Sequence, residues 1–418
     1  MNRKKILRCL AVFLLISFIC FTRTTLVTKA ANGTVNEAEI KEKIKSAWNK
    51  HETKIEFGRR EVLTSDYKRI YYELLYSNPE YFYVSSYIRY SYYPNESDYI
   101  VTGTITYESD DVNTINKQKS EYAQAIEAFK KTVDNSWSDL EKIIYINNYI
   151  CRACEYDKTI KKDNIYDAYG ALVNHTAVCE GYSMAFKALA DQVGISSCLV
   201  SSDSLGHAWN MVKLNGKYYM LDVTWDDSEG DVRGISTQYL LKSLSWFNSS
   251  EGRHAASDYK IKGIGPDPSA ANDTQYDKAS WSGRYNYIFL VNGGLYGTDG
   301  SGKIVKYSCN GKTVSVEREL INLSNKQWMI KGTSSYFSYQ AGLVVSSLGD
   351  KLYYSLPESI MQYNVKTGES KEVYTLTDDE KSNNVIYGIA ITYDNKLKYF
   401  IANNVNNGGT NKEVPVTY

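Results

Sequence analysis

The sequence has 418 residues, of which 43% are hydrophobic and 23% charged, with 48 basic and 48 acidic side chains. This length predicts two to three domains, and the composition is that of an ordinary globular protein, which excludes collagen-like, disordered and multi-span membrane classes. No basic patch is present, so we expect no nucleic-acid partner.

Residues 1–30 predict an export signal. A charged start, MNRKK, precedes an apolar run from Ile6 to Phe21, and Ala30 offers a small residue at a cleavage site. The run is shorter than the roughly 20 residues that span a bilayer, so we expect cleavage, with an uncleaved membrane anchor as the alternative. A chain starting at Ala31 keeps 42 basic and 48 acidic residues, a net charge of −6. We therefore expect a secreted or cell-surface protein that touches the membrane only through an uncleaved anchor.

Residues 31–135 predict an N-terminal α+β region. Helical spacing of apolar residues marks residues 37–50 and 64–76, and the second helix should stop at Asn78-Pro79. The runs 81–93 and 98–108 favour strands around a turn at 94–97. A long helix is expected over about 116–132.

Residues 136–262 form the predicted catalytic core. A helix should begin at Ser138, because Ser138 with Glu141 is a capping-box pattern.

Residues 263–273, GIGPDPSAAND, have the composition of a linker. Residues 274–418 predict an all-β domain of three weakly repeated strand–turn–strand units. Three blade-like units are too few for a closed propeller, so an open array or a sandwich is equally possible.

Seven cysteines are present, two of them inside the signal. Five remain, an odd number that leaves at least one thiol unpaired in an oxidising compartment. If Cys179 is that thiol, the other four can pair, but the spacing does not fix how. The Cys151/Cys154 pair lies inside a predicted helix without a second such pair, and we interpret it as two small core residues.

The stretch 178–227 carries the candidate chemistry. Cys179 precedes a helical pattern that ends near Gly194, so its thiol should sit at a helix N-terminus, where an anion is favoured and backbone N–H groups face a developing oxyanion. The plain alternative for a single cysteine is a small buried hydrophobe.

A hairpin adds weight to the catalytic interpretation. Asn215-Gly216 is a strong hairpin turn signal, and it pairs Leu214 with Lys217. Continued along both strands, this register places His207, Trp209, Asp222 and Thr224 on one face, with His207 and Asp222 as diagonal neighbours within hydrogen-bonding reach. Asp222 would then orient His207 toward the thiol, as nucleophile–base–orienter triads require.

The segments CEGYSMAF and GHAWNMVKLNGKYYMLDVTWDD resemble the transglutaminase-like superfamily of papain-related cysteine enzymes, in a bacterial exported member. The resemblance spans about 140–259 and implies an α+β papain-like core. It implies Cys179 as nucleophile, His207 as general base and Asp222 as its orienter. Residues expected to bind substrate or support the site are Trp209, Tyr182, Trp225, Asn210 and Thr224. We expected His254 to be structural, His175 to be a loop residue, and Tyr166 and Tyr169 to be weak oxyanion candidates.

These observations predict an exported enzyme that forms a thioester on Cys179 from a peptide or protein amide. The acyl group then passes to water, as in a peptidase or amidase, or to an amine, as in cross-linking. Cell-wall or surface proteins are the expected substrates. We expect no cofactor and no metal, because no ligand spacing is present. The alternative is a surface adhesion protein whose triad is inactive.

Overall fold

The computed structural model describes residues 27–30, 33–227, 234–406 and 408–415. The chain divides into two compact units: the first runs up to Tyr71 and includes Tyr87–Thr106, and the second comprises Tyr72–Ser86 and Tyr107 onward. Residues 1–26, with most of the predicted export signal, lie outside the described residues, so cleavage stays a prediction. Among the described helices, none combines the length and apolar character needed to cross a bilayer.

The first unit has the predicted mixture of helices and short strands. Helix α2 spans Glu37–Asn49 and α3 begins at Thr64 and ends at Ser77, next to Asn78-Pro79 as expected. The strands form one three-stranded sheet and two pairs. They are β1 (Val27–Ala30), β2 (Gly33–Asn36), β3 (Lys54–Glu56), β4 (Val62–Leu63), β5 (Arg89–Ser91), β6 (Tyr99–Ile100) and β7 (Thr102–Thr104).

The predicted strand over residues 81–93 is wrong for most of its length. Only Arg89–Ser91 is a strand, whereas Pro79–Tyr81 form a 3-10 turn, η1. The aromatic residues that suggested a strand are buried instead: Phe82 stacks on Tyr169 with ring centroids 4.9 Å apart. Aromatic burial, rather than strand pairing, explains the composition of this run.

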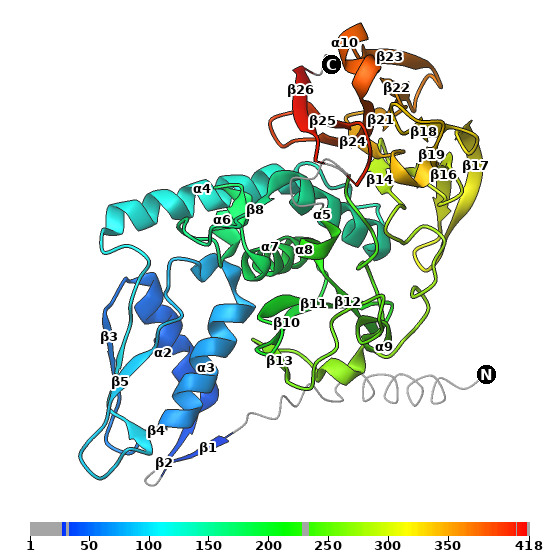
Figure 1. The fold of residues 1–418 in the computed structure, drawn as a ribbon. Coiled ribbons are helices and arrows are strands. Elements are labelled where there is room, and N and C mark those ends of the chain that lie inside the picture. Colours follow the sequence, from blue (N-terminus) through cyan, green and yellow to red (C-terminus); the bar gives the residue numbers. More distant parts are fainter. Residues whose placement is uncertain (1–26, 31–32, 228–233, 407, 416–418) are drawn as a thin grey trace, which may run out of the picture. The chain divides into compact units, whose positions relative to one another are not determined.

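The second unit contains the helices of the predicted core. Helix α5 (Asp139–Ala153) begins at Ser138, whose side chain and that of Glu141 form the expected capping box. Helix α7 (Cys179–Gln192) is buried along most of its length and packs on strand β11 (Figure 1). The other helices are α4 (Val112–Lys130), α6 (Ala168–Leu172), α8 (Val223–Asp226), α9 (Leu244–Phe247), α10 (Asp378–Asn383) and the 3-10 turns η2 (Pro268–Ala270) and η3 (Tyr339–Ala341).

A four-stranded antiparallel sheet lies against α7, in the order β12-β11-β10-β13. Its strands are β10 (Ser197–Ser202), β11 (His207–Leu214), β12 (Lys217–Leu221) and β13 (Tyr259–Lys262); β8 (Glu155–Tyr156) and β9 (Thr176–Ala177) form a separate parallel pair. The predicted hairpin register is confirmed, since Leu214 pairs with Lys217 and the ladder continues to Asn210 and Leu221. Asn215 and Gly216 both have positive φ, 51° and 81°, as a type I′ turn requires.

The second strand of the hairpin is shorter than predicted. It ends at Leu221, and Asp222 caps the short helix α8 instead of continuing the strand. Asp222 and Thr224 therefore do not lie opposite Trp209 and His207 in a ladder. The local reason is the Asp222 side chain, whose Oδ1 accepts a hydrogen bond from the Trp225 N–H at 3.2 Å and so favours a helical turn.

The C-terminal region consists of antiparallel sheets of four, four and three strands, in addition to one pair. All neighbours are consecutive in sequence. The strands are β14 (Ile288–Val291), β15 (Gly294–Thr298), β16 (Lys303–Cys309), β17 (Val314–Asn322), the pair β18 (Gln327–Met329) and β19 (Tyr336–Ser338), then β20 (Val345–Leu348), β21 (Lys351–Ser355), β22 (Ser359–Asn364), β23 (Ser370–Thr375), β24 (Val385–Ile391), β25 (Lys396–Ala402) and β26 (Thr410–Pro415). The many antiparallel strands agree with the predicted all-β character, whereas the repeat relationship stays a prediction.

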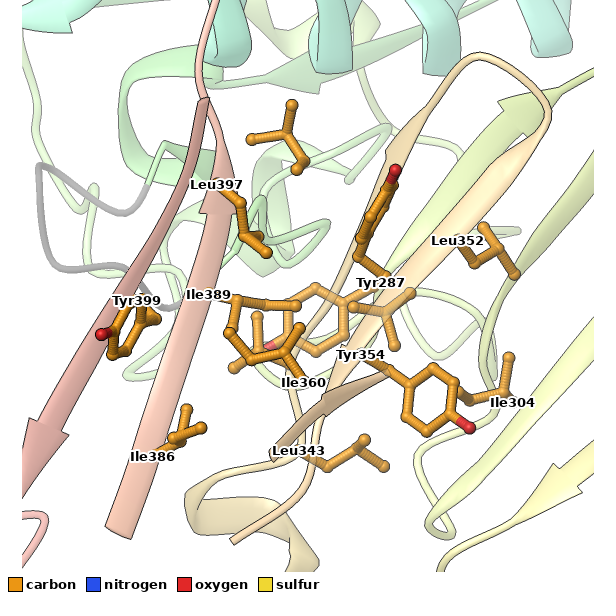
Figure 2. Packing of buried hydrophobic residues seen from close by; sticks show 14 of the residues in the cluster. Tyr287, Ile304, Leu343, Leu352, Tyr354, Ile360, Ile386, Ile389, Leu397 and Tyr399 are labelled. Carbon is orange, nitrogen blue, oxygen red and sulfur yellow. The ribbon is translucent and has the colours of Figure 1, made fainter. Parts of the chain in front are cut away.

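One apolar cluster joins these sheets. Residues from separate sheets, such as Ile304, Leu352 and Ile389, meet in it, and Tyr287 and Tyr354 fill the spaces between them (Figure 2). The sheets share this core, so they bury their apolar faces against one another.

Polar contacts hold the β region on the core of the second unit. The buried Asn148 of α5 donates to the Ile288 carbonyl at 2.6 Å, and α5 lies beside β14 (Figure 1). Arg152, one turn further along α5, donates to Asn395 Oδ1 at 2.8 Å. Core and β region therefore form one compact body, which is the setting of the candidate site.

Candidate active site

Cys179 occupies the first position of helix α7. The preceding Val178 is extended and caps the helix without a side-chain bond, so the cysteine backbone begins the helix. The Cys179 side chain is half-buried, which leaves the thiol accessible. Two positions later, a Cβ on Gly181 would lie 2.4 Å from the Ile165 carbonyl, so only glycine permits this close approach of the helix start to the preceding loop.

His207 stands at the start of β11 and faces this thiol. Its Nε2 lies 2.6 Å from Asp222 Oδ2, and the ring also makes a hydrogen bond with Cys179. Burial disfavours the imidazolium, but the charge of Asp222, with hydrogen bonds to Asp222 and Cys179, outweighs burial and raises the pKa of His207 to about 10. At neutral pH the site therefore holds an imidazolium beside the thiol.

Asp222 is fully buried behind His207. Burial opposes its charge, but His207 and His254 hold the pKa of Asp222 below its usual range. A buried carboxylate with several donors is stable, because its hydrogen bonds replace those it lost to water.

His254 belongs to this site, which corrects its expected role outside it. Its Nε2 lies 2.9 Å from the same Asp222 Oδ2, its Nδ1 lies 2.6 Å from the Gly252 carbonyl, and the residue is 1% exposed. His254 comes 32 residues after Asp222, and neither strand nor helix periodicity links the two. In the sequence, the feature that could have linked His254 to the site is its position within the segment that resembles the superfamily.

Aromatic rings enclose the histidines, and they change two expectations. Trp209 is 1% exposed and stacks on His207 with centroids 5.7 Å apart, so it supports the ring from behind rather than forming an open wall. Tyr182 is 0% exposed, and its hydroxyl donates to Asp227 Oδ2 at 2.5 Å, so it too is internal. Trp225 is half-buried and stays the candidate for substrate contact.

The remaining candidate residues differ in their contacts. Asn210 donates to the Ser183 carbonyl at 3.0 Å and so ties β11 to α7. Thr224 is buried in α8. The Tyr169 hydroxyl donates to Glu121 at 2.7 Å, and Tyr166 is exposed. His175 stacks on Tyr393 with centroids 4.0 Å apart and contacts the Ala153 carbonyl, so its partners belong to the fold.

The five cysteines outside the signal are all free thiols. Cys151 and Cys154 are buried, as expected of small core residues, and burial raises the pKa of both. Burial also raises the pKa of Cys198 to about 11. Of the thiols, only Cys179 and Cys309 are half-buried, and Cys179 alone has a histidine contact among the interactions of the described residues.

One group of side chains has its metal-ligating atoms close together, all within 4.8 Å of one another. It consists of His207, Asp222 and His254. The two histidine nitrogens already contact one carboxylate oxygen directly, at 2.6 and 2.9 Å. An ion between them would have to separate these groups, so the geometry fits a hydrogen-bonded carboxylate better than a set of metal ligands.

Residues 126–223 match the family model described as the transglutaminase-like superfamily, a span that contains Cys179, His207 and Asp222. The matched span covers the core alone, and it confirms the resemblance drawn from the motifs of this segment.

The relatives are distant. A kyphoscoliosis peptidase of Mus musculus is 27% identical over 124 residues, 26% of this chain and 19% of that protein. The chain thus spans about a fifth of the length of the curated relatives it matches. Similar solved structures include a TGase (14% identity, 34% of this chain and 44% of that one, TM-score 0.23) and a candidate cysteine protease from Cytophaga hutchinsonii (14% identity, 43% and 73%, TM-score 0.22).

Proposed function

We propose that this protein is an exported cysteine acyl-transfer enzyme that acts on amides of peptides or proteins. The observation that carries the proposal is the alignment of a half-buried thiol at a helix N-terminus, an imidazole in contact with it, and a buried carboxylate on the ring nitrogen Nε2. Each group has the neighbour that its role in covalent catalysis requires.

The first half of the reaction uses the imidazolium as an acid. The Cys179 thiolate attacks the amide carbon, and the carbonyl π electrons move to oxygen to give a tetrahedral oxyanion. Backbone N–H groups at the start of α7 face this region and favour negative charge there. When the oxyanion collapses, the C–N bond breaks, His207 gives its proton to the departing nitrogen, and an amine or ammonia leaves a thioester.

The second half regenerates the thiolate. His207 takes a proton from water or from an acceptor amine, whose oxygen or nitrogen attacks the thioester carbon. The C–S bond breaks and yields a carboxylic acid or a new amide. Asp222 keeps the ring orientation through both halves, because its Oδ2 holds Nε2.

Hydrolysis is the favoured outcome over cross-linking, since the chain offers no feature that marks a lysine acceptor site. The peptidase name of the mouse relative points in the same direction. The predicted signal at residues 1–30 supports action outside the cytoplasm, on cell-wall or surface proteins.

A three-way assay tests the reaction. The full chain is incubated with a pool of glutamine-containing peptides while ammonia release, incorporation of a fluorescent amine and peptide cleavage are followed, with Cys179→Ala as the matched control. We expect at least one activity, lost in the variant. If the two proteins are indistinguishable in all three, the triad is inactive and the alternative, a surface binding protein, stands.

A further inference from the structure

A cavity of about 1080 Å³ lies beside the catalytic site, within the second unit. One side is formed by α8 and the loop around Arg253, and the other by the β region, including Arg284, Tyr285 and Phe337. Trp225 lines this cavity, and its ring also lies 5.6 Å from that of His207 and 4.3 Å from that of His254. Trp225 therefore contacts both the cavity and the two histidines of the site.

Two arginines at this cavity are held on aromatic rings. The guanidinium carbon of Arg253 lies 5.0 Å from the Trp225 ring centroid, and that of Arg284 lies 5.6 Å from the Tyr285 centroid. Both side chains belong to exposed residues, and among the described residues neither forms an ion pair. A stacked guanidinium keeps its N–H fork available, in the geometry that binds a carboxylate through two parallel bonds.

The backbone at Arg253 is held in an uncommon conformation. Its φ is +58°, in the left-handed region, although it is not a glycine. Hydrogen bonds on both sides maintain it: its N–H donates to the Ser249 carbonyl, and the His254 N–H donates to the Phe247 carbonyl. Such a conformation is strained for a residue with a side chain and recurs at binding and catalytic sites. The same loop thus positions a cavity arginine and, at the next residue, the second histidine on Asp222.

The acidic residues in the lining do not neutralise the positive charge of the two arginines. Asp227 accepts a hydrogen bond from Tyr182 at 2.5 Å. Asp226 is fully buried, and burial raises its pKa well above the usual range, which disfavours its charged form. Among the described residues of the lining, Glu251 is the one exposed acid, against two exposed arginines.

The aromatic lining, which includes Tyr239, Tyr287 and Tyr387, suits a mixed polar and apolar chain rather than a small ion.

We infer that this cavity is a substrate subsite that binds a peptide segment bearing a carboxylate, with Arg253 and Arg284 as the anchors, next to the amide that Cys179 attacks. The inference rests on the proposed function and names its substrate class. The carboxylate comes from an acidic side chain or from a peptide C-terminus, and both present the same group to the arginines.

Binding to the full chain carrying Cys179→Ala tests this without turnover. Three pools of nonapeptides share a central glutamine and random neighbours: one has glutamates at fixed flanking positions and an amidated C-terminus, one has glutamines there and a free C-terminus, and one has glutamines and an amidated C-terminus. We expect at least one carboxylate-bearing pool to bind about tenfold or more tighter than the neutral pool, the effect of one charge-assisted bond.

Variants locate the site. Arg253→Gln and Arg284→Gln should each remove most of the tenfold preference, and Glu251→Gln should increase it. Arg89→Gln is the matched control, because Arg89 also stacks on a tyrosine, Tyr87, at 5.0 Å but lies in the first unit. Arg253 is next to His254 in the chain, so its substitution also changes the surroundings of the catalytic residues. Arg284→Gln measures the contribution of the cavity to peptide binding independently of those residues.

Equal binding of all three pools, no binding of any pool, or an unchanged preference in both cavity variants would overturn the inference. Tighter binding of a chitin hexasaccharide than of every peptide pool would also overturn it. Failure of the proposed function is seen separately, as an absence of Cys179-dependent reaction in a protein that still prefers the acidic peptides.

Discussion

His254 Nε2 lies 2.9 Å from Asp222 Oδ2, the oxygen that His207 also contacts, at 2.6 Å. Both ring nitrogens of His254 face oxygen acceptors, since Nδ1 lies 2.6 Å from the Gly252 carbonyl. Asp222 is thus held between two imidazoles, and His254 acts on the thiol only through Asp222 and His207.

Replacing His254 tests this positioning role. His254→Leu removes both ring nitrogens, and we expect kcat to fall about 10- to 100-fold, because a small displacement of the base misaligns the reacting atoms. His254→Gln keeps one donor and should recover part of the loss. The measurement is kcat and KM against pH, and a structural role alone would not move the pH profile. His175→Leu, outside the site, is the control; full activity and an unchanged profile in His254→Leu would contradict the assignment.

An Asp-to-Asn substitution should change the free energy of unfolding in opposite directions at two neighbouring positions, Asp222 and Asp226. Asp222→Asn replaces a charged acceptor of two imidazoles, and we expect the free energy of unfolding at pH 7 to fall by about 3 kcal/mol. Asp226→Asn should raise it by about 1 kcal/mol, because the buried carboxyl of Asp226 has a raised pKa and its folded state resists ionisation. Chemical denaturation of the two variants and the wild type measures both; a loss of similar size in both would contradict the different states assigned to the two acids.

Stability should also depend on the titration of His207. Its pKa is raised from 6.5 to about 10, so its contribution is complete below about pH 6.5 and is lost as pH rises through about 10. The unfolding free energy of the wild type should therefore converge on that of His207→Gln between these values. Denaturation curves at pH 6, 8 and 10 follow the difference, and a difference that grows with pH would show that the wrong protonation state has been assigned.

The hairpin that carries His207 depends on its turn. Gly216 has φ +81°, and a Cβ there would meet no atom within 4 Å, so Gly216→Ala tests backbone strain alone. We expect a loss of about 1 kcal/mol in unfolding free energy. Gly408→Ala, which also has open space but no positive φ, is the matched control. Equal effects at the two sites would argue against the type I′ turn.

Local signals predicted the parts of the site that depend on local chemistry. The Asn215-Gly216 turn set the register of β11 and β12, and the Ser138–Glu141 capping box set the start of α5. The family model matches residues 126–223, a span that includes the motif around Cys179.

The errors arose where a nonlocal contact or a competing local bond decided the outcome. The register set by the turn was continued past Leu221 and predicted a strand at Asp222 and Thr224, but the Asp222 side chain caps a helix there. Burial of Trp209 and Tyr182, and the approach of His254 to Asp222, depend on how separate segments pack, and no sequence period encodes such packing.

The central claim is that His207 is an imidazolium in contact with Cys179, and the alkylation rate of Cys179 against pH tests it most directly. Iodoacetamide labelling is followed by mass spectrometry of the Cys179 peptide, with Cys309, the other half-buried thiol, as internal control. We predict that Cys179 reacts faster than Cys309 from pH 6 to 8, because the neighbouring imidazolium favours the nucleophilic thiolate, and that His207→Ala removes most of this difference. A Cys179 rate that is no faster than that of Cys309, or that is unchanged in His207→Ala, would contradict the account.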